Sequence, residues 1–180
     1  ELNRQFPGVS DAGAGSTNPY TFGNWTRPGD EWTPPRFTVF RVTVSNYEFP
    51  KVVLDPTRLH ITTANNRSYR SMDYGELYEY YQAYWLGRTG DGRDKFASRT
   101  DLLRRTMFTD DPIFSGQESQ GYVVFPLLDD DVTEITVTVE DVVLRFDYAD
   151  QPIETADIAY RFDREVHQGR QPPPQHILQH

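Results

Sequence analysis

The sequence contains no cysteine, and this absence excludes several classes of protein at once. Without thiols there is no disulfide framework, no zinc–thiolate site, no iron–sulfur cluster and no cysteine nucleophile. The chain also lacks any run of about 18 apolar residues, the length that a membrane-spanning helix requires. Histidine is scarce, and three of the four histidines lie in or beside the C-terminal tail. The residues that usually carry metal or covalent catalysis are therefore few.

Catalytic sequence motifs are missing as well. The chain has no G-x-S-x-G nucleophile motif, no phosphate-binding G-x-x-x-x-G-K-[ST] loop and no dinucleotide-binding G-x-G-x-x-G turn. We therefore predict a protein that is not an enzyme and that uses no cofactor. A carboxylate-dependent hydrolase is a less favoured alternative, since acidic side chains are abundant enough for two to lie at the separation found in glycosidases.

Negative charge is in excess, with 27 acidic against 18 basic residues. An acidic chain binds nucleic acid poorly, so no nucleic-acid partner is expected. The net charge of −9 lies wholly between positions 129 and 165, where there are twelve acidic and three basic residues. This stretch is either a solvated surface or a surface that attracts a basic partner or a divalent cation. Asp129, Asp130 and Asp131 are weak candidates for metal ligands, because hard cations prefer several oxygens; no metal site is otherwise expected.

The two ends of the chain are rich in proline or glycine and are predicted to be irregular. Residues 1–35 contain ten prolines and glycines together with several aromatic residues, which a disordered linker would lack. This pattern predicts an extended arm whose rings pack on the domain or on a partner, with Trp25 and Trp32 as contact candidates. Residues 168–180 form a second arm, where Pro172, Pro173 and Pro174 favour polyproline II.

Residues 36–167 are predicted to form a β domain, because β-branched and aromatic residues alternate in short runs between turn signals. A change in the parity of the apolar positions predicts a bulge or turn at 140–141. We expect the strand 157–166 to be half exposed, with Ile158, Tyr160 and Phe162 on its apolar face. The other expected strands are 37–45, 51–54, 58–63, 122–127, 134–139 and 142–146.

An insert at about 72–108 is predicted to be helical. Apolar residues recur at helical spacing over 72–87, Asp73 can cap the start, and a second short helix is expected at 101–108 after an exposed loop at 89–93. Trp85 belongs to the main apolar stripe, whereas Tyr80 and Tyr84 fall on another side of the helix. They either pack or form a contact patch, since aromatic residues are enriched at interfaces.

Two segments resemble motifs of bacterial extracytoplasmic immunoglobulin-like domains, which occur in secreted proteins and lipoproteins of unknown function. Val42–Asn46 is similar to their Val-Thr-Val-x-Asn strand. Ser115–Gln117 followed by Gly121–Phe125 is similar to their Pro-Gly-Glu…Gly-x-Val-Val-Phe segment, with Ser in place of Pro and Gln in place of Glu. The resemblance covers residues 36–166. It implies an immunoglobulin-like antiparallel β-sandwich and a periplasmic or cell-surface location, and it implies no catalytic residues.

The sequence thus predicts a mainly β protein with one or two short helical inserts and long terminal arms. We expect a non-catalytic accessory or structural subunit that docks through its arms and aromatic insert onto other protein subunits of a larger extracellular or membrane-associated assembly. With no transmembrane segment, membrane attachment would be peripheral or through a lipid on a removed N-terminal segment. The alternative is a carbohydrate- or ligand-binding β-sandwich module that stacks aromatic rings on its ligand.

Overall fold

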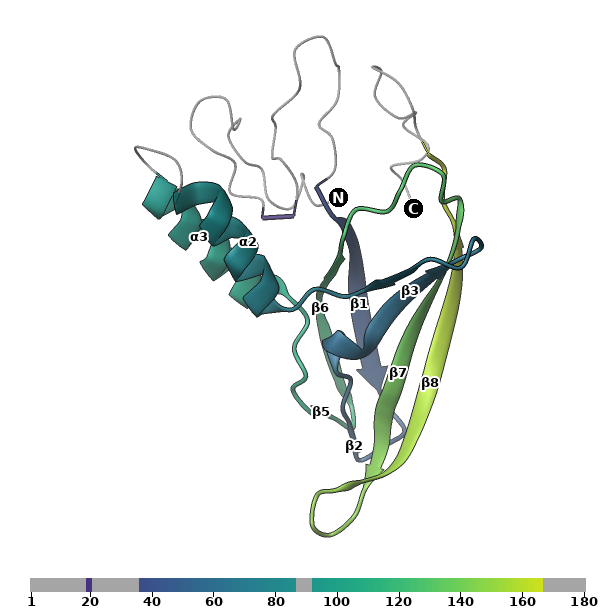
Figure 1. Cartoon of the computed structure of the whole chain (residues 1–180). Coiled ribbons are helices and arrows are strands. Elements are labelled where there is room, and N and C mark those ends of the chain that lie inside the picture. Colours follow the sequence, from purple (N-terminus) through teal and green to yellow (C-terminus); the bar gives the residue numbers. More distant parts are fainter. Residues whose placement is uncertain (1–18, 21–35, 87–91, 167–180) are drawn as a thin grey trace.

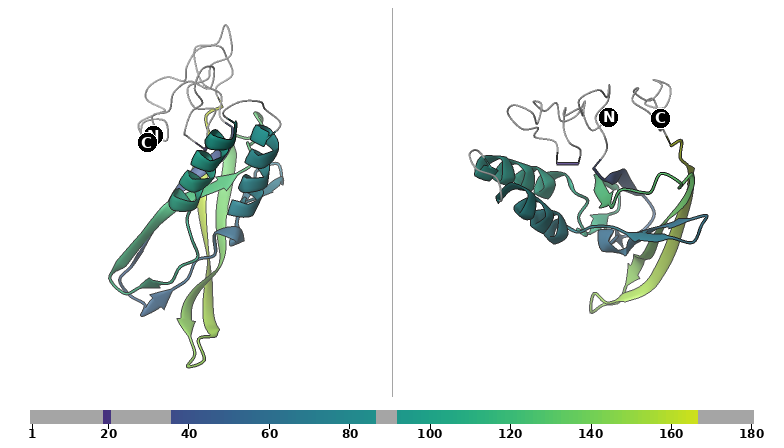
Figure 2. Two further views of the ribbon diagram at one scale, coloured as in Figure 1. Left: turned by 90° about the vertical axis from the view of Figure 1, so that its left-hand side faces the viewer. Right: turned by 45° about the horizontal axis from the view of Figure 1, so that its top comes forward.

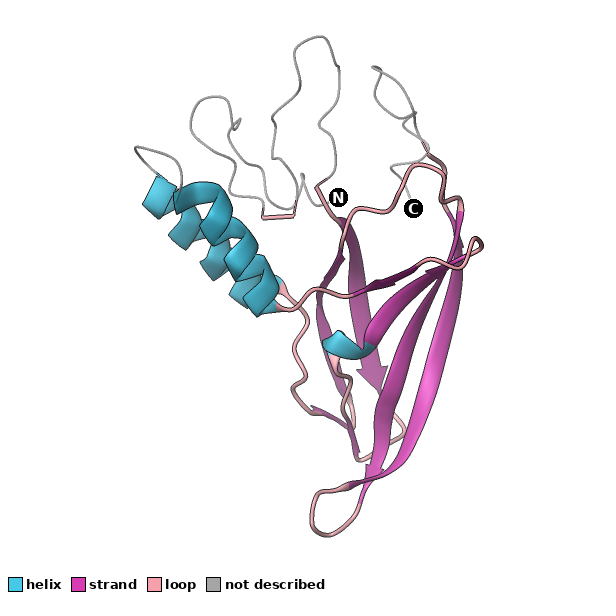
Figure 3. Cartoon of the chain, viewed as in Figure 1, coloured by secondary structure: helices cyan, strands magenta, loops and turns pink. Residues whose placement is uncertain are grey.

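Over the residues that the structure describes, the fold is mainly β, with antiparallel sheets and two α-helices, as the sequence predicts. The structure, a computed structural model, describes residues 19–20, 36–86 and 92–166 (Figure 1). Trp25, Trp32 and Pro172–Pro174 lie outside the described residues. Neither α-helix in the described ranges is long and apolar enough to cross a membrane. The strands and the helix pair occupy separate regions of the molecule (Figure 3).

Two long strands form an antiparallel ribbon near the middle of the molecule. β1 (Thr38–Asn46) pairs with β6 (Gln117–Phe125), from Thr38 opposite Phe125 to Asn46 opposite Gln117. Alternation of β-branched or aromatic residues with polar ones favours this half-buried strand pair. One face of the ribbon packs toward the four-stranded sheet and the other packs against the helices. The candidate site lies on the face toward the sheet.

A four-stranded antiparallel sheet faces the ribbon. Its order is β4 (Ser68–Arg70), β3 (Leu59–Thr63), β7 (Glu134–Phe146) and β8 (Pro152–Asp163). The short strands β2 (Lys51–Val52) and β5 (Ile113–Phe114) pair with each other, and the 3-10 helix η1 (Pro56–Arg58) precedes β3. A bridge between Val53 and Val143 extends the β2 segment alongside β7.

The predicted bulge at 140–141 is confirmed, within one continuous strand. The register of β7 against β8 shifts between Val139 and Val142, and Asp141 has a φ of 54°. An extra residue returns the apolar set to the same face, so Val137, Val139 and Val142 are all buried on the core side.

The boundaries of β8 differ from the prediction of 157–166. The strand begins at Pro152 and ends at Asp163. The first residues lack a clear apolar alternation, and pairing with β7 in the hairpin makes them a strand; Arg145, for example, lies opposite Glu154 and forms an ion pair with it at 3.2 Å.

The helices are α2 (Tyr74–Leu86) and α3 (Gly92–Thr106), which pack side by side (Figure 2). The first matches the predicted helix, but α3 begins nine residues before the expected position 101. Gly92 and Arg93, expected in an exposed loop, are helical, and residues 89–91 lie outside the described residues. Arg99 and Thr100 hide the early part of the apolar stripe in the sequence, yet both are buried in the structure.

Two apolar clusters hold these layers together. The larger lies between the inner face of the ribbon and the four-stranded sheet, with Val123, Phe125, Ile61 and Val137 among its buried members. The smaller lies between the outer face of the ribbon and the helices. Its buried residues are Tyr20, Phe37, Leu77, Tyr81, Leu103, Tyr122 and Val124.

Candidate functional site: an open apolar groove between two strand edges

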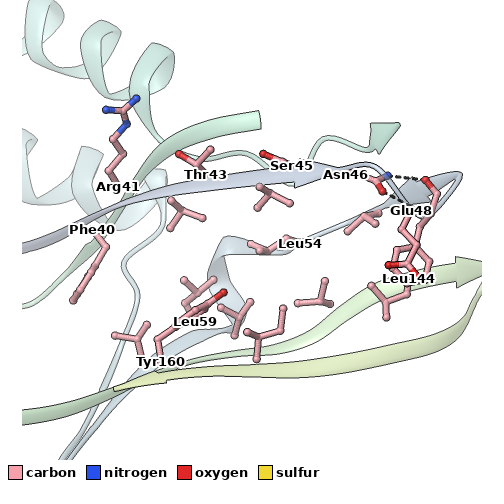
Figure 4. Close-up of a pocket in the computed structure, with 18 of the residues that line it drawn as sticks. Phe40, Arg41, Thr43, Ser45, Asn46, Glu48, Leu54, Leu59, Leu144 and Tyr160 are labelled. Carbon is pink, nitrogen blue, oxygen red and sulfur yellow. Dashed lines mark hydrogen bonds between the residues drawn. The ribbon is translucent and has the colours of Figure 1, made fainter. Parts of the chain in front are cut away.

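The ribbon and the four-stranded sheet each end in a strand with one unpaired side. Among the described residues, β1 pairs only with β6, and β8 pairs only with β7. The free sides of β1 and β8 face each other across a groove of about 630 Å³ (Figure 4). This volume lies within the range of about 300–1,000 Å³ that is typical of ligand pockets.

The inward face of the groove is apolar. Side chains from β1 point toward those of β7 and β8, whereas Arg41 and Thr43 point away from the groove (Figure 4). The apolar lining residues are Phe40, Val42, Val44, Phe49, Val52, Leu54, Leu59, Val137, Val139, Val142, Leu144, Ile158, Tyr160 and Phe162.

The β8 wall of this groove is unusually open to solvent. Ile158, Tyr160 and Phe162 are 37%, 56% and 43% exposed. The sequence correctly placed these three residues on one apolar face, but that face is only partly covered. A contiguous apolar surface on an otherwise polar protein marks a site of interaction.

Both ends of the groove are defined by specific contacts. At one end the rings of Phe40 and Phe162 meet at a centroid distance of 5.5 Å. At the other end Asn46 is buried, and its side-chain amide donates to the carbonyl oxygens of Phe49 and Ile113 at 2.8 and 2.9 Å. These bonds fix the loop after β1, where the groove-lining Tyr47 is 76% exposed. The groove is therefore a shaped feature with ordered ends.

Of the aromatic residues predicted to contact a partner, Tyr80 is the one whose side chain is described. It is 37% exposed, and its ring packs edge-on against Phe37 and against Tyr81 at centroid distances of 5.2 Å. Tyr84 and Trp85 belong to α2, but their side chains lie outside the described part of the structure. Tyr80 thus contributes to the helix–ribbon contact and retains a partly exposed edge.

The acidic residues Asp129 and Asp131 are held by one arginine. The guanidinium of Arg67 donates to both carboxylates at 2.7 Å, and Tyr69 donates its hydroxyl to Asp129 at 2.8 Å. The hydrogen bond from Arg67 lowers the pKa of Asp131 below its ordinary value. Asp130 is exposed. Across residues 19–20, 36–86 and 92–166, no three His, Asp or Glu side chains are grouped to hold a metal ion.

His60 is the one histidine in the described ranges. Its Nδ1 lies 3.8 Å from a carboxylate oxygen of Glu140 on the surface of the sheet. This pair faces away from the groove, because Leu59 and Ile61 on either side of His60 are the residues that face the core.

The groove was not predicted from the sequence. Period-two alternation in β1 and β8 reveals which residues share a face, but it does not reveal whether another strand covers that face. The nearest signal is the predicted half exposure of β8.

The comparisons with known proteins do not add a relative: no protein-family model, no curated protein and no solved structure matches this chain.

Proposed function

We propose that this chain is a non-catalytic accessory subunit that binds another protein of a larger extracellular or membrane-associated assembly. The observation that carries the proposal is the apolar groove between the free sides of β1 and β8. Its inward side chains offer hydrophobic contact area without a cluster of polar groups that would orient a reacting substrate. Immunoglobulin-like β-sandwich architecture and a periplasmic or cell-surface location form part of this proposal and rest on the motif resemblance.

The groove supports protein binding because covering it removes exposed apolar side chains from water. Full burial of an aliphatic or aromatic side chain stabilises a complex by about 1.5–3 kcal/mol. A side chain that is already half buried gains only part of this free energy when a partner covers it. Ile158, Tyr160 and Phe162 can all gain burial in this way. The terminal arms and the residues Tyr80, Tyr84 and Trp85 of α2 remain candidate contacts with the same assembly.

Native purification tests this proposal. We expect the chain to be recovered from its source in a stable complex larger than a monomer, and Val44→Asp to reduce that complex because it places a charge in the groove. Thr62→Asp, on a half-buried position of β3 that does not line the groove, is the matched control. Recovery of the chain as a lone monomer would overturn the proposal.

Photo-cross-linking locates the contact. A photoreactive phenylalanine in place of Tyr47, at the groove, should cross-link to a partner protein in the native complex. The same amino acid in place of Tyr148, fully exposed at the β7–β8 hairpin, is the comparison. Cross-links from position 148 and none from position 47 would place the partner elsewhere.

A ligand-binding module is the second candidate function, favoured by the volume of the groove. The occupant would be an apolar molecule, since the inward lining offers little beyond the Tyr160 hydroxyl for hydrogen bonding. The carbohydrate form of this alternative stays a prediction, because the side chains of Tyr84 and Trp85 and the whole of Trp25 and Trp32 are outside the described residues.

A further inference from the structure

We propose that the groove takes an extended segment of a partner polypeptide as an added β-strand between β1 and β8. The segment would carry apolar residues at every second position and basic or polar residues between them. This inference rests on the proposed function and specifies how the partner is bound. Four observations carry it: the backbone directions of β1 and β8, the parity of their side chains, the charge of one wall, and the sequence of the terminal arms.

The first observation is that backbone groups of β1 point into the gap. The N–H of Met72 donates to the carbonyl of Val124 at 2.7 Å. Val124, in β6, therefore turns its backbone N–H and C=O away from β1. Successive residues of a strand turn these groups to opposite sides, so Val123 and its odd-numbered neighbours bond to β1. Their partners in the register are even-numbered residues. The N–H and C=O of Thr43 and Ser45 therefore face away from β6, toward the free side.

The same reasoning places backbone groups of β8 on the opposite side of the gap. The N–H of Arg164 donates to the carbonyl of Thr133 at 2.6 Å. Arg164 is even-numbered, and bonded residues alternate along a strand, so the register implies that the even-numbered residues of β8 bond to β7. The polar backbone groups of Ala159 and Arg161 therefore face away from β7. A strand lying between the two edges could bond to both, antiparallel to one and parallel to the other.

The second observation is that the side chains beside the gap have matching parity. The inward residues are even-numbered on both edges, such as Val42 and Val44 on β1 and Ile158 and Tyr160 on β8. An added strand would place alternate side chains among them and the others in solvent. Peptide recognition by strand addition has this form, in which backbone bonds give affinity and alternate side-chain pockets give specificity.

The third observation is the charge of the β7–β8 wall. Residues 134–163, which form β7, β8 and the hairpin turn between them, carry eight acidic and two basic residues. A partner segment with lysine or arginine at its outward positions would be attracted by this charge. A second copy of this chain would meet like charge at its own β8, which disfavours pairing of two identical β8 edges.

The fourth observation concerns this chain's own arms, which are poor candidates for the added strand. Neither 1–35 nor 167–180 has more than two large apolar residues at alternate positions within a proline-free run. Proline lacks the N–H that a strand bonded on both sides must donate. Neither arm is therefore the proposed occupant, and the proposal is a segment of a partner polypeptide.

The test uses a defined peptide and the full chain. The probe is an acetylated and amidated nine-residue peptide of sequence K-V-T-V-K-V-T-V-K, with binding measured by calorimetry at low and moderate salt. Its control is the same peptide with N-methyl groups on both threonines, which keeps the side chains but blocks backbone pairing along one edge. We expect binding of the first peptide, weaker binding at higher salt, and at least about tenfold weaker binding of the control.

Edge variants of the protein test the same contact from the other side. Thr43→Pro removes an N–H that faces the gap and leaves the bonds to β6, because proline is tolerated where a strand edge is free. We expect at least about tenfold weaker peptide binding for Thr43→Pro and for Ala159→Pro, and little change for Thr43→Val, which keeps the N–H. Amide exchange at Ser45 and Arg161 should slow when the peptide is bound.

Several results would overturn strand addition. Equal binding of the N-methylated peptide would do so without any protein variant, and so would equal binding by Thr43→Pro with an unchanged melting temperature. Palmitate binding in the groove with no peptide binding would show an apolar-ligand site instead, and concentration-dependent dimers that bury Val44 would show a second copy as the occupant. If Val44→Asp dissolves the native complex while Thr43→Pro keeps it, strand addition fails and the proposed protein-binding function stands.

Discussion

At the scale of single residues, Gly121 illustrates how closely the helical insert approaches the ribbon. A Cβ built at this position would lie 2.5 Å from both the Cα and the N of Phe108. The backbone of Phe108 is fixed there, because its N–H donates to the carbonyl of Tyr122 at 3.0 Å. The absence of a side chain at position 121 therefore allows the segment after α3 to lie against β6.

Gly121→Ala should consequently destabilise the fold. We expect a loss of about 3 kcal/mol in the free energy of unfolding, because the clash is with backbone atoms that cannot rotate away. Urea denaturation measures this change. Gly75→Ala is the control, since its Cβ would meet a side-chain atom, Asp73 Oδ1, at 3.2 Å and no backbone atom, so its stability should stay within about 1 kcal/mol. Equal stability of wild type and Gly121→Ala would contradict the close approach.

Tyr81 links burial to pH dependence. It is fully buried, its hydroxyl donates to the carbonyl of Pro19, and burial raises its pKa to about 12. In the unfolded state the tyrosine hydroxyl releases its proton at a pH of about 10. The stability that Tyr81 contributes through its raised pKa is therefore fully present below pH 10. It is lost as the pH rises from there toward 12.

We therefore expect the free energy of unfolding to fall between pH 10 and pH 12, and Tyr81→Phe to make that fall shallower. At neutral pH the variant should cost about 1 kcal/mol, the contribution of its hydrogen bond. Chemical denaturation at a series of pH values measures both effects. Tyr148→Phe, at a fully exposed position, should not change stability at neutral pH. If the free energy of unfolding of Tyr81→Phe falls as steeply between pH 10 and pH 12 as that of the wild type, Tyr81 is not the cause of the fall.

At the scale of elements, the start of α2 confirms a prediction from the sequence. The Asp73 side chain accepts a hydrogen bond from the N–H of Glu76 at 2.8 Å, and the Glu76 side chain accepts one from the N–H of Asp73 at 3.1 Å. This reciprocal pair satisfies two backbone donors that a helix start leaves open. The local sequence was sufficient here because both partners lie within four residues.

Asp73→Ala should cost about 1 kcal/mol, since it removes the acceptor for the helix start. Asp73→Asn keeps an acceptor and should cost less than half as much. Thermal melts of the two variants, followed by circular dichroism at 222 nm, measure the difference. Equal destabilisation by both substitutions would indicate that charge matters more than the capping geometry.

At the scale of the whole molecule, the N-terminal arm and the core are not separate. Tyr20 is 1% exposed, packs against Tyr122 at a ring distance of 5.2 Å, and shares a hydrogen bond of 2.5 Å with Thr106. The predicted boundary at residue 35 separates this residue from the cluster that it fills. The arm therefore contributes at least one anchor to the folded unit.

Fragments of the chain measure that contribution. A fragment of residues 36–166 should unfold cooperatively but be less stable by about 3 kcal/mol than a fragment of residues 19–166, because Tyr20 leaves a cavity. Tyr20→Ala in the full chain should reproduce most of this loss, and Tyr20→Phe should lose only the hydrogen bond. Equal stability of the two fragments would show that Tyr20 does not anchor the arm.

Much of the local structure could be predicted from the sequence. The apolar period of two in β1 and β8, the parity change at Glu140 and the cap at Asp73 depend on neighbours in the chain. The start of α3 could not be predicted, because buried Arg99 and Thr100 look like surface residues in the sequence. Such positions are decided by packing against distant elements, which overrides local preference.

The sequence by itself determined the mainly β class, the helix at 74–86 and the concentration of negative charge in 129–165. Each follows from the order of residues along the chain. Tertiary structure alone decided that β1 and β8 face each other without pairing, and that the apolar faces between them stay partly open. The physical reason is that alternation defines two faces of a strand, whereas the element that covers a face comes from elsewhere in the fold.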